Sequence, residues 1–319
     1  MRPSSPSWCQ FYSLGFFVQS LGRSGYRKLG VGSSGALDSL AVQVGNVLLG
    51  NGADAPSIEM LLFPIEVRFQ ASHSFAVTGN TGKIFLDGKE LPPWWRATGH
   101  EGQILRIESS SEGGIGYLTI GGKIDIESVL RSASTDLKGG FGGHQGRMLK
   151  AGDLLNIRSD KSSATHYSFG ASPPGELDSG IIRFLPGFEI DQLAKEHARA
   201  FYESVWTVSR QSSRIGFKLE GPQLQFSDPI ELLSYGVLPG LIQLPPGGQP
   251  IVLLADAQTS GGYPRLGSVI SSDLRLVAQS SPGKAIQFRQ CSFAEAAEAE
   301  ADEQDYLDRL SNLREVICP

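Results

Sequence analysis

The sequence predicts a mainly β protein with a few helices, and three observations support this class. Short stretches of alternating or continuous apolar residues recur along the chain, each bounded by residues that favour turns. The 39 glycines and 18 prolines among 319 residues are spread without a period, which indicates many tight turns between short elements. Helical spacing of apolar residues is confined to a few stretches. A chain of this length can form one large domain or two smaller ones.

The N-terminal half predicts a loose arm over residues 1–15 and a β subdomain over residues 16–175. A glycine-rich segment at 21–35 can bring backbone amides close to a ligand, because glycine leaves the main chain uncovered. A helix is expected at 36–49, where apolar residues share one face and a Gly-Asn-Gly sequence follows. The remaining pattern predicts a β meander or barrel. Its expected strands are residues 16–19, 58–62, 65–69, 75–77, 83–86, 103–107 and 117–120.

The C-terminal half predicts a second β subdomain over residues 176–295 and a helix over residues 296–319. A Ser-, Pro- and Gly-rich stretch at 159–180 is the expected connection between the subdomains. A helical pattern at 191–204 interrupts the strands, and a charged amphipathic pattern starts at Phe293. The expected strands are residues 181–184, 205–208, 241–244, 250–255 and 285–288.

The stretch from Gly247 to Pro264 is the first candidate for a site. A nearly unbroken apolar run predicts a buried strand, and this strand is followed by a carboxylate, an amide, two hydroxyls and two glycines. Binding residues often lie on loops that a rigid strand positions, whereas a buried strand with an ordinary Gly-Gly turn is the structural alternative. Local sequence leaves both interpretations open.

Other polar residues also have two interpretations. Asp38, at the start of the predicted helix, suits a capping role or a ligand. Arg214 offers a planar fork for a carboxylate or phosphate, or is a solvated surface arginine. A second glycine-rich stretch, residues 139–155, either cradles an anion or turns tightly, and it lacks the spacing of a P-loop or a GxGxxG motif.

Composition narrows the class of partner and the compartment. A formal net charge of −5 without clustered Lys and Arg argues against nucleic-acid binding, so we expect small-molecule or protein partners. No stretch approaches the length that spans a membrane, and we expect no membrane partner. The three cysteines are widely spaced and match no zinc-site pattern, so we expect no metal site and a reducing cytoplasm.

Ordered motif blocks recur from about Val18 to Ala294. They are Gly22-Arg23-Ser24-Gly25-Tyr26, Ser34-Gly35-Ala36-Leu37-Asp38, Gly50-Asn51, Gly121-Gly122, Ser134-Thr135-Asp136, Gly146-Arg147, Ser213-Arg214-Ile215-Gly216, Gly240-Leu241-Ile242-Gln243 and Asp256 to Pro264. Together these blocks resemble the allophanate hydrolase subunit 2 family. This family is also called the biotin-dependent carboxyltransferase-like family, and it includes KipA and the C subunit of 5-oxoprolinase.

The resemblance implies a fold, a function and partners. The expected fold has two β-barrel-like subdomains of cyclophilin-like architecture. The expected function is that of the C subunit in an ATP-dependent 5-oxoprolinase complex, an amide (lactam) hydrolase that cleaves 5-oxoproline to L-glutamate and is active only as a complex. The implied companions are a protein of the allophanate hydrolase subunit 1 or KipI type and the TIM-barrel-like A subunit of 5-oxoprolinase. ATP with Mg would be held mainly by one of these companions.

Two alternatives remain open within the resemblance. A biotin-dependent carboxyltransferase would act on urea or a similar amide, and its biotin would arrive on another protein, because this chain has no Met-Lys-Met motif. A KipA-like regulator would bind a KipI-type kinase inhibitor without catalysis.

The sequence also departs from the family pattern at two places. Ser20 stands where an Asp is usual, and Arg131-Ser132-Ala133-Ser134-Thr135-Asp136 stands where Gly-Ser-Arg-Ser-Thr-Asp is usual.

Both enzymatic readings require donors for an oxygen that gains negative charge, a group that manages a proton, and a cation for an anionic substrate. Asp256 is the predicted group for proton handling or for organising a metal phosphate. Gln258, Thr259 and Tyr263 are the other predicted catalytic residues, which orient the substrate. The predicted substrate-binding residues are Arg214, Ser213, Gly261, Gly262, Gln243, Asp38 and Arg147.

Overall fold

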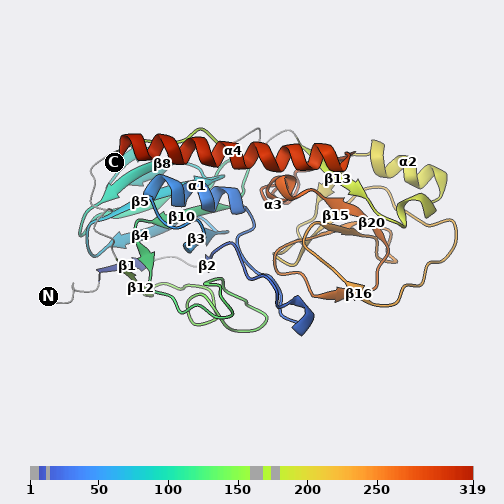
Figure 1. Ribbon diagram of the computed structural model, residues 1–319, viewed down its shortest axis with the longest axis horizontal. Coiled ribbons are helices and arrows are strands. Elements are labelled where there is room, and N and C mark those ends of the chain that lie inside the picture. The colour runs from blue at the N-terminus through green and yellow to red at the C-terminus, as the bar shows by residue number, and fades with distance from the viewer. Residues whose placement is uncertain (1–6, 12–14, 159–167, 174–179, 319) are drawn as a thin grey trace. The chain divides into compact units, whose positions relative to one another are not determined.

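A computed structural model describes residues 7–11, 15–158, 168–173 and 180–318 (Figure 1). The chain forms two compact units, and each unit is built from segments that are not contiguous in the sequence. The first unit comprises residues 1–23, 38–174 and 304–319, and the second comprises residues 24–37 and 175–303. The expected subdomain boundary at residues 175 and 176 lies outside the described residues.

The first unit contains two antiparallel sheets. The seven-stranded sheet has the order β11-β12-β1-β4-β9-β6-β7, and the five-stranded sheet has the order β2-β3-β10-β5-β8. The strands of the larger sheet are β1 (Ser7–Phe11), β4 (Ile65–Phe69), β6 (Ile84–Leu86), β7 (Lys89–Leu91), β9 (Ile104–Ile107), β11 (Lys123–Ile124) and β12 (Leu154–Arg158). Those of the smaller sheet are β2 (Phe16–Gln19), β3 (Ser57–Met60), β5 (His73–Gly79), β8 (Trp95–Gly99) and β10 (Gly116–Ile120).

The expected loose arm is wrong for residues 7–11. These residues form β1, which pairs with β12 on one side and β4 on the other, so its backbone groups are satisfied within the sheet. Cys9 and Phe11, two residues apart, both lie in the core with exposed fractions of 1% and 0%. The rest of the expected arm that precedes Gly15 lies outside the described residues.

Alternating side chains build the core of the first unit. Ile65, Val67 and Phe69 of β4 are fully buried, and the residues between them face outward. The five-stranded sheet is instead buried on both faces along β5 and β10, because helix α1 (Ser39–Leu49) packs over these two strands (Figure 1). Helix α1 agrees with the helix predicted at 36–49, although it begins three residues later.

The second unit contains a closed seven-stranded barrel with the order β13-β20-β17-β18-β15-β14-β21. Strands β13 and β21 are parallel where they close the barrel, and the other neighbours are antiparallel. The strands are β13 (Ile181–Pro186), β14 (Trp206–Val208), β15 (Gly216–Glu220), β17 (Leu241–Gln243), β18 (Ile251–Leu253), β20 (Arg265–Val269) and β21 (Ala285–Gln290). A separate ribbon pairs β16 (Tyr235–Gly236) with β19 (Ser260–Gly261).

Aromatic side chains fill part of the core of the second unit. The rings of Phe201 and Phe288 stack with centroids 4.9 Å apart, and Phe184 meets Phe201 edge to face at 5.5 Å. Phe201 is carried by α2 (Lys195–Glu203), which is shorter than the helix predicted at 191–204. The helix starts late because Ala194 has an extended backbone with ψ of 141°.

The C-terminal helix α4 (Phe293–Ile317) begins with reciprocal capping. The Glu295 carboxylate accepts from the Ser292 backbone N–H at 2.7 Å, and Ser292 Oγ accepts from the Glu295 N–H at 3.2 Å. Residues of α4 up to Glu303 belong to the second unit, and those from Gln304 belong to the first. In the described part of the chain, no helix is long and apolar enough to cross a membrane. The predicted mainly β class with a few helices is confirmed.

Candidate functional site

The predicted buried strand is β18, and polar residues begin just beyond its end. Val252, Leu253 and Leu254 are all buried, which agrees with the apolar run in the sequence. Asp256 follows, and its backbone N–H donates to the carbonyl oxygen of Arg214 at 3.0 Å. The barrel strand therefore delivers Asp256 to the turn that joins β14 to β15.

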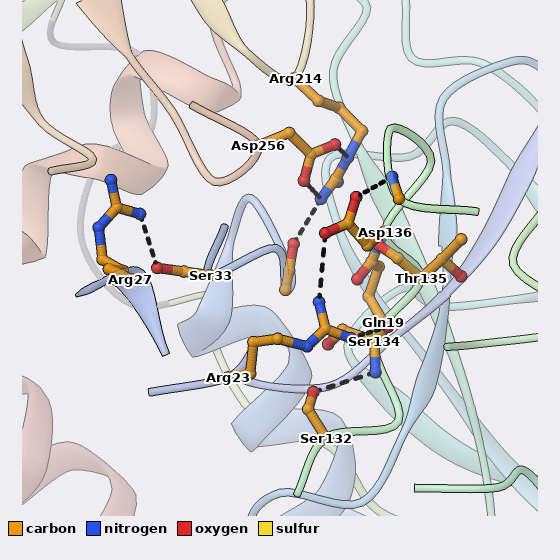
Figure 2. A network of polar contacts seen from close by, with 12 residues as sticks. Gln19, Arg23, Arg27, Ser33, Ser132, Ser134, Thr135, Asp136, Arg214 and Asp256 are labelled. Carbon is orange, nitrogen blue, oxygen red and sulfur yellow. Dashed lines mark hydrogen bonds and ion pairs between the residues drawn. The ribbon is translucent and has the colours of Figure 1, made fainter. Parts of the chain in front are cut away.

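Arg214 and Asp256 form a two-pronged ion pair (Figure 2). Arg214 Nε donates to Asp256 Oδ2 at 2.8 Å, and Arg214 Nη2 donates to Oδ1 at 3.1 Å. The exposed fractions of the two side chains are 7% and 15%. Such a fork fixes both the position and the rotation of the carboxylate. Arg214 was predicted to clamp a substrate carboxylate or phosphate, and the structure shows this guanidinium directed at Asp256 instead.

The turn that carries Arg214 is tight. Ser213 and Gly216 exchange backbone hydrogen bonds at 3.2 and 3.1 Å, and Ser213 Oγ accepts from the Ile215 N–H at 3.3 Å. The Ser213 hydroxyl thus stabilises the turn. Substrate contact by Ser213 stays a prediction.

Two arginines fasten the glycine-rich segment of residues 24–37 to this loop within the second unit. Arg214 Nη2 also donates to the carbonyl oxygen of Gly35 at 2.6 Å. Arg27 Nη2 donates to the carbonyl oxygens of Gln258, at 2.9 Å, and of Val237. Arg27 Nη1 donates to Ser33 Oγ at 3.0 Å (Figure 2). The segment was expected to approach a ligand; here its backbone and Arg27 form one edge of the candidate site.

Arg27 is a residue that sequence reasoning missed. Burial lowers its pKa, in keeping with a guanidinium that is partly withdrawn from water. No local pattern separates Arg27 from its neighbour Lys28, which is exposed. The difference arises because Arg27 meets carbonyl groups that are more than 200 residues away in the sequence.

Two side-chain amides converge near Gly261. A Cβ atom added to Gly261 would lie 3.0 Å from Gln243 Nε2 and 3.7 Å from Gln258 Nε2. It would also lie 3.2 Å from Val237 Cγ1. The absence of a side chain at Gly261 therefore lets its backbone lie close to the Gln243 amide, with the Gln258 amide nearby.

Gln243 is positioned by a cluster of Tyr235, Tyr263 and Arg265, of which only Tyr263 was predicted as a site residue. The buried Gln243 donates from Nε2 to Tyr235 Oη at 3.0 Å, and the Tyr235 hydroxyl donates to the carbonyl oxygen of Tyr263. The Arg265 guanidinium lies 4.6 Å from the centroid of the Tyr235 ring. Arg265 Nε donates to Glu189 Oε2 at 2.9 Å. Burial raises the pKa of Tyr235, so this hydroxyl stays protonated as a donor.

The other predicted residues of this loop are placed through their backbone. The Thr259 carbonyl oxygen accepts from the Val237 N–H at 3.2 Å. Tyr263 contributes its carbonyl oxygen to Tyr235, while its side chain is 45% exposed. Gly262 is exposed next to β19. Catalytic roles for the Thr259 and Tyr263 side chains stay predictions.

Asp38 and Arg147 belong to the first unit. Asp38 is buried at the start of α1, where its Oδ1 accepts from the Ala41 N–H at 3.0 Å, so it caps the helix. Arg147 donates to both carboxylate oxygens of Asp153, at 2.6 and 3.0 Å, and this hydrogen bonding holds the pKa of Asp153 below its usual value. The structure therefore gives both predicted ligand-binding residues local structural partners.

The departures from the family pattern meet in a buried polar cluster of the first unit (Figure 2). Ser20 is fully buried, its backbone N–H donates to Ser134 Oγ at 2.9 Å, and its Oγ lies 3.2 Å from the hydroxyls of Ser132 and Ser134. Arg23 Nη2 donates to the Ser134 carbonyl oxygen at 2.6 Å, and its Nη1 lies 3.9 Å from Asp136. Hydroxyl groups thus surround the position where an Asp is usual.

The His, Cys, Asp and Glu side chains of the described residues are the possible metal ligands. No group of three or more His, Cys, Asp or Glu side chains in this part of the chain is arranged to hold an ion. At the candidate site, both oxygens of Asp256 are bonded to Arg214. Both roles predicted for Asp256, proton handling and the organisation of a metal phosphate, stay predictions.

The fold and the site define a barrel protein with a partly buried Arg–Asp pair, a glycine-rich segment held by hydrogen bonds, and two amide side chains near Gly261. Residues 29–290 match the family described as carboxyltransferase domain, subdomain A and B. This chain belongs to that family, and the resemblance drawn from its motif blocks is confirmed.

Named relatives cover nearly the whole chain. The chain is 42% identical to the 5-oxoprolinase C subunit of Escherichia coli (strain K12) over 295 residues, which cover 92% of this chain and 94% of that protein. It is 37% identical to the 5-oxoprolinase C subunit of Haemophilus influenzae over 296 residues, covering 93% and 94%. Among solved structures, the urea amidolyase of K. lactis is similar with a TM-score of 0.87 at 26% identity. That match covers 97% of this chain but 20% of the amidolyase.

Proposed function

We propose that this chain is the C subunit of an ATP-dependent 5-oxoprolinase complex, which cleaves 5-oxoproline to L-glutamate. The observation that carries the proposal is the similarity to two proteins named as this component of 5-oxoprolinase, along almost their entire length. The candidate site supports it, because its groups match the needs of lactam opening.

The proposed chemistry uses three parts of the site. When a lactam carbonyl is attacked, its oxygen gains negative charge, and the Gln243 and Gln258 amides near Gly261 are placed to donate to it. As water attacks the lactam carbon, Asp256 accepts the proton that the water loses, through the lone pairs that Arg214 leaves available, and this proton passes to the ring nitrogen when the C–N bond breaks. Arg214 is a positioning residue for this carboxylate, and Arg27 positions the backbone of Gln258.

We place ATP and its Mg²⁺ mainly on companion proteins. The described residues of this chain offer no cluster of acidic ligands, and the carboxylate of Asp256 is engaged by a cation. We therefore assign no phosphoryl-transfer step to this chain. The proposed companions are a protein of the allophanate hydrolase subunit 1 (KipI) type and the TIM-barrel-like A subunit of 5-oxoprolinase, and we propose that turnover requires the complex.

The test is reconstitution of the complex. The chain is purified with its companion proteins, and ATP hydrolysis and glutamate formation are measured with and without 5-oxoproline. We expect 5-oxoproline to stimulate both, and omission of this chain to abolish glutamate formation. The absence of stimulation by 5-oxoproline in the full complex would contradict the proposal.

A carboxyltransferase acting on urea or a similar amide is the second candidate. The similarity to the K. lactis urea amidolyase structure favours it. Biotin would then arrive on a separate carrier protein. Urea-dependent loss of carboxylate from carboxybiotin, without 5-oxoproline-dependent ATP hydrolysis, would select this candidate. Stable binding of a KipI-type partner without either activity would select the regulatory alternative.

A further inference from the structure

The first unit contains a cavity of about 590 Å³ that the proposed function does not use. Its lining includes Gly50, Asn51 and Gly122, which belong to two of the motif blocks recognised in the sequence. The candidate site in the second unit leaves these two blocks without a role. Residues of the family motif blocks therefore come together at this cavity as well as at the candidate site.

Partly buried hydrogen bonds hold the wall of the cavity in place. Asn51 Nδ2 donates to Asn46 Oδ1 at 3.1 Å and to the Ile120 carbonyl oxygen at 2.9 Å. Asn51 Oδ1 accepts from the Gly122 N–H at 2.9 Å. The fully buried Asn46 donates to the Ala55 carbonyl oxygen at 2.9 Å. Two asparagines thus fix the loop after α1 against the turn after β10, so the wall is formed before any ligand binds.

The charged residues that line the cavity are mostly cationic. The lining contains three cations, Lys123, Arg131 and Arg158, and one carboxylate, that of Asp54. Arg158 is bound to Asp125 at 2.6 Å, so Lys123, Arg131 and the Asp54 carboxylate remain, with an excess of one positive charge. Within the described part of the chain, neither Lys123 nor Arg131 forms an ion pair. Because the whole protein carries a formal net charge of −5, this local excess of positive charge is distinctive.

Arg131 reaches the cavity from a strained turn. Val129 and Ser132 exchange backbone hydrogen bonds at 2.9 and 3.2 Å, and the two residues between them, Leu130 and Arg131, have φ angles of +51° and +62°. Such a turn favours glycine or asparagine, and strained backbones of this kind concentrate at binding sites. Arg131 and Ala133, where the sequence departs from the family pattern, both line the cavity.

We propose that this cavity binds a small organic dianion, either a dicarboxylate or a phosphorylated metabolite. Lys123 and Arg131 bind its anionic groups, and the apolar wall of Leu49, Pro56 and Ile126 contacts its carbon body. The volume is large enough for a metabolite rather than for a single inorganic ion. The lining residues of this cavity all belong to the first unit, whereas the residues of the proposed lactam chemistry belong to the second.

Calorimetric titration of the full chain tests the proposal. The probes are succinate and methyl phosphate, with propionate as a monoanion at the same ionic strength. We expect at least one dianion to bind tenfold or more tightly than propionate, and the stronger of the two identifies the source of the charge. Equal and weak binding of all three probes would overturn the proposal.

Variants assign the binding to this cavity. Arg131→Gly removes the cation and suits the left-handed backbone, so we expect at least a tenfold loss of affinity with an unchanged or higher melting temperature. Lys123→Gln should weaken binding to a similar degree. Lys138→Gln, which removes an exposed lysine of the same unit outside the cavity, should change affinity less than twofold. A loss in Lys138→Gln as large as in Arg131→Gly would show nonspecific attraction and overturn the assignment.

Discussion

Arg214 holds Asp256 through both oxygens of its carboxylate, at 2.8 and 3.1 Å, and the same guanidinium holds the carbonyl oxygen of Gly35 at 2.6 Å. Arg214 thus donates to the glycine-rich segment, and Arg27 of that segment donates in turn to the carbonyl oxygen of Gln258 in the loop after β18. The segment of residues 24–37 and the polar end of β18 are therefore one hydrogen-bonded assembly. Substitutions on either side should alter the same site.

Asp256→Asn should lower the turnover of the reconstituted complex at least a hundredfold, because Asn cannot accept the proton that we assign to Asp256. Asn keeps one oxygen for Arg214, so the free energy of unfolding should fall by about 2 kcal/mol, less than breaking a buried pair by truncation. Steady-state kinetics and urea unfolding measure the two effects. Asp228→Asn, at an exposed acid of the same unit, is the control. Full turnover by Asp256→Asn would remove its proposed role.

Arg27→Gln should loosen the glycine-rich segment. Glutamine is shorter than arginine and carries no charge, so it cannot reach Ser33, Val237 and Gln258 together. Hydrogen exchange measured by mass spectrometry should show faster exchange in peptides covering residues 24–37 and 256–262. Lys28→Gln, at the adjacent exposed cation, should leave exchange unchanged. Equal protection in Arg27→Gln and the unmodified chain would mean that Arg27 does not fasten the segment.

Gly261→Ala should reduce activity without unfolding the protein. The added methyl group would lie 3.0 Å from Gln243 Nε2 and would occupy the space beside the two amides. We expect at least a tenfold fall in kcat/KM and a loss of unfolding free energy of no more than about 1–2 kcal/mol. Gly247→Ala is a matched control, because a Cβ there meets no atom within 4 Å. If kcat/KM is the same for both variants, the proposed oxygen site near Gly261 is wrong.

The Glu189–Arg265 pair should make stability depend on pH. Hydrogen bonding to Arg265 holds the pKa of Glu189 below its usual value of 4.5 in the folded protein. The pair therefore contributes stability above about pH 4.5, and the contribution is lost as pH falls through the lower folded pKa. Glu189→Gln should lower the unfolding free energy by about 1 kcal/mol at pH 7 and by much less at pH 3.

Urea unfolding of Glu189→Gln at both pH values, followed by tryptophan fluorescence, gives this comparison. Glu203→Gln interrupts an exposed pair with Arg199 and should have little effect at either pH. An unchanged difference between the unmodified chain and Glu189→Gln from pH 7 to pH 3 would show that the ionised pair is not the cause.

Local sequence was sufficient where burial has a simple period. The alternation of Ile65, Val67 and Phe69 predicted β4 with its observed ends, and the apolar face before Gly50 predicted helix α1, although α1 starts at Ser39 rather than at residue 36. The apolar run before Asp256 predicted a buried strand, and the motif blocks predicted the family. In contrast, β1 was missed although it is as long as β4, because pairing with β12 and β4 holds its backbone in the sheet.

By itself, then, the sequence determined the mainly β class, most strands and the loop on which the candidate site lies. The tertiary structure alone decided which groups meet there. Arg214 reaches Asp256 across 42 residues of sequence and Gly35 across 179. Periodicity predicts which side of an element is buried, because residues on one face recur at the period of the helix or strand. It carries no information about which distant donor satisfies a buried carboxylate or carbonyl group, because the closed barrel and the returning glycine-rich segment set that choice.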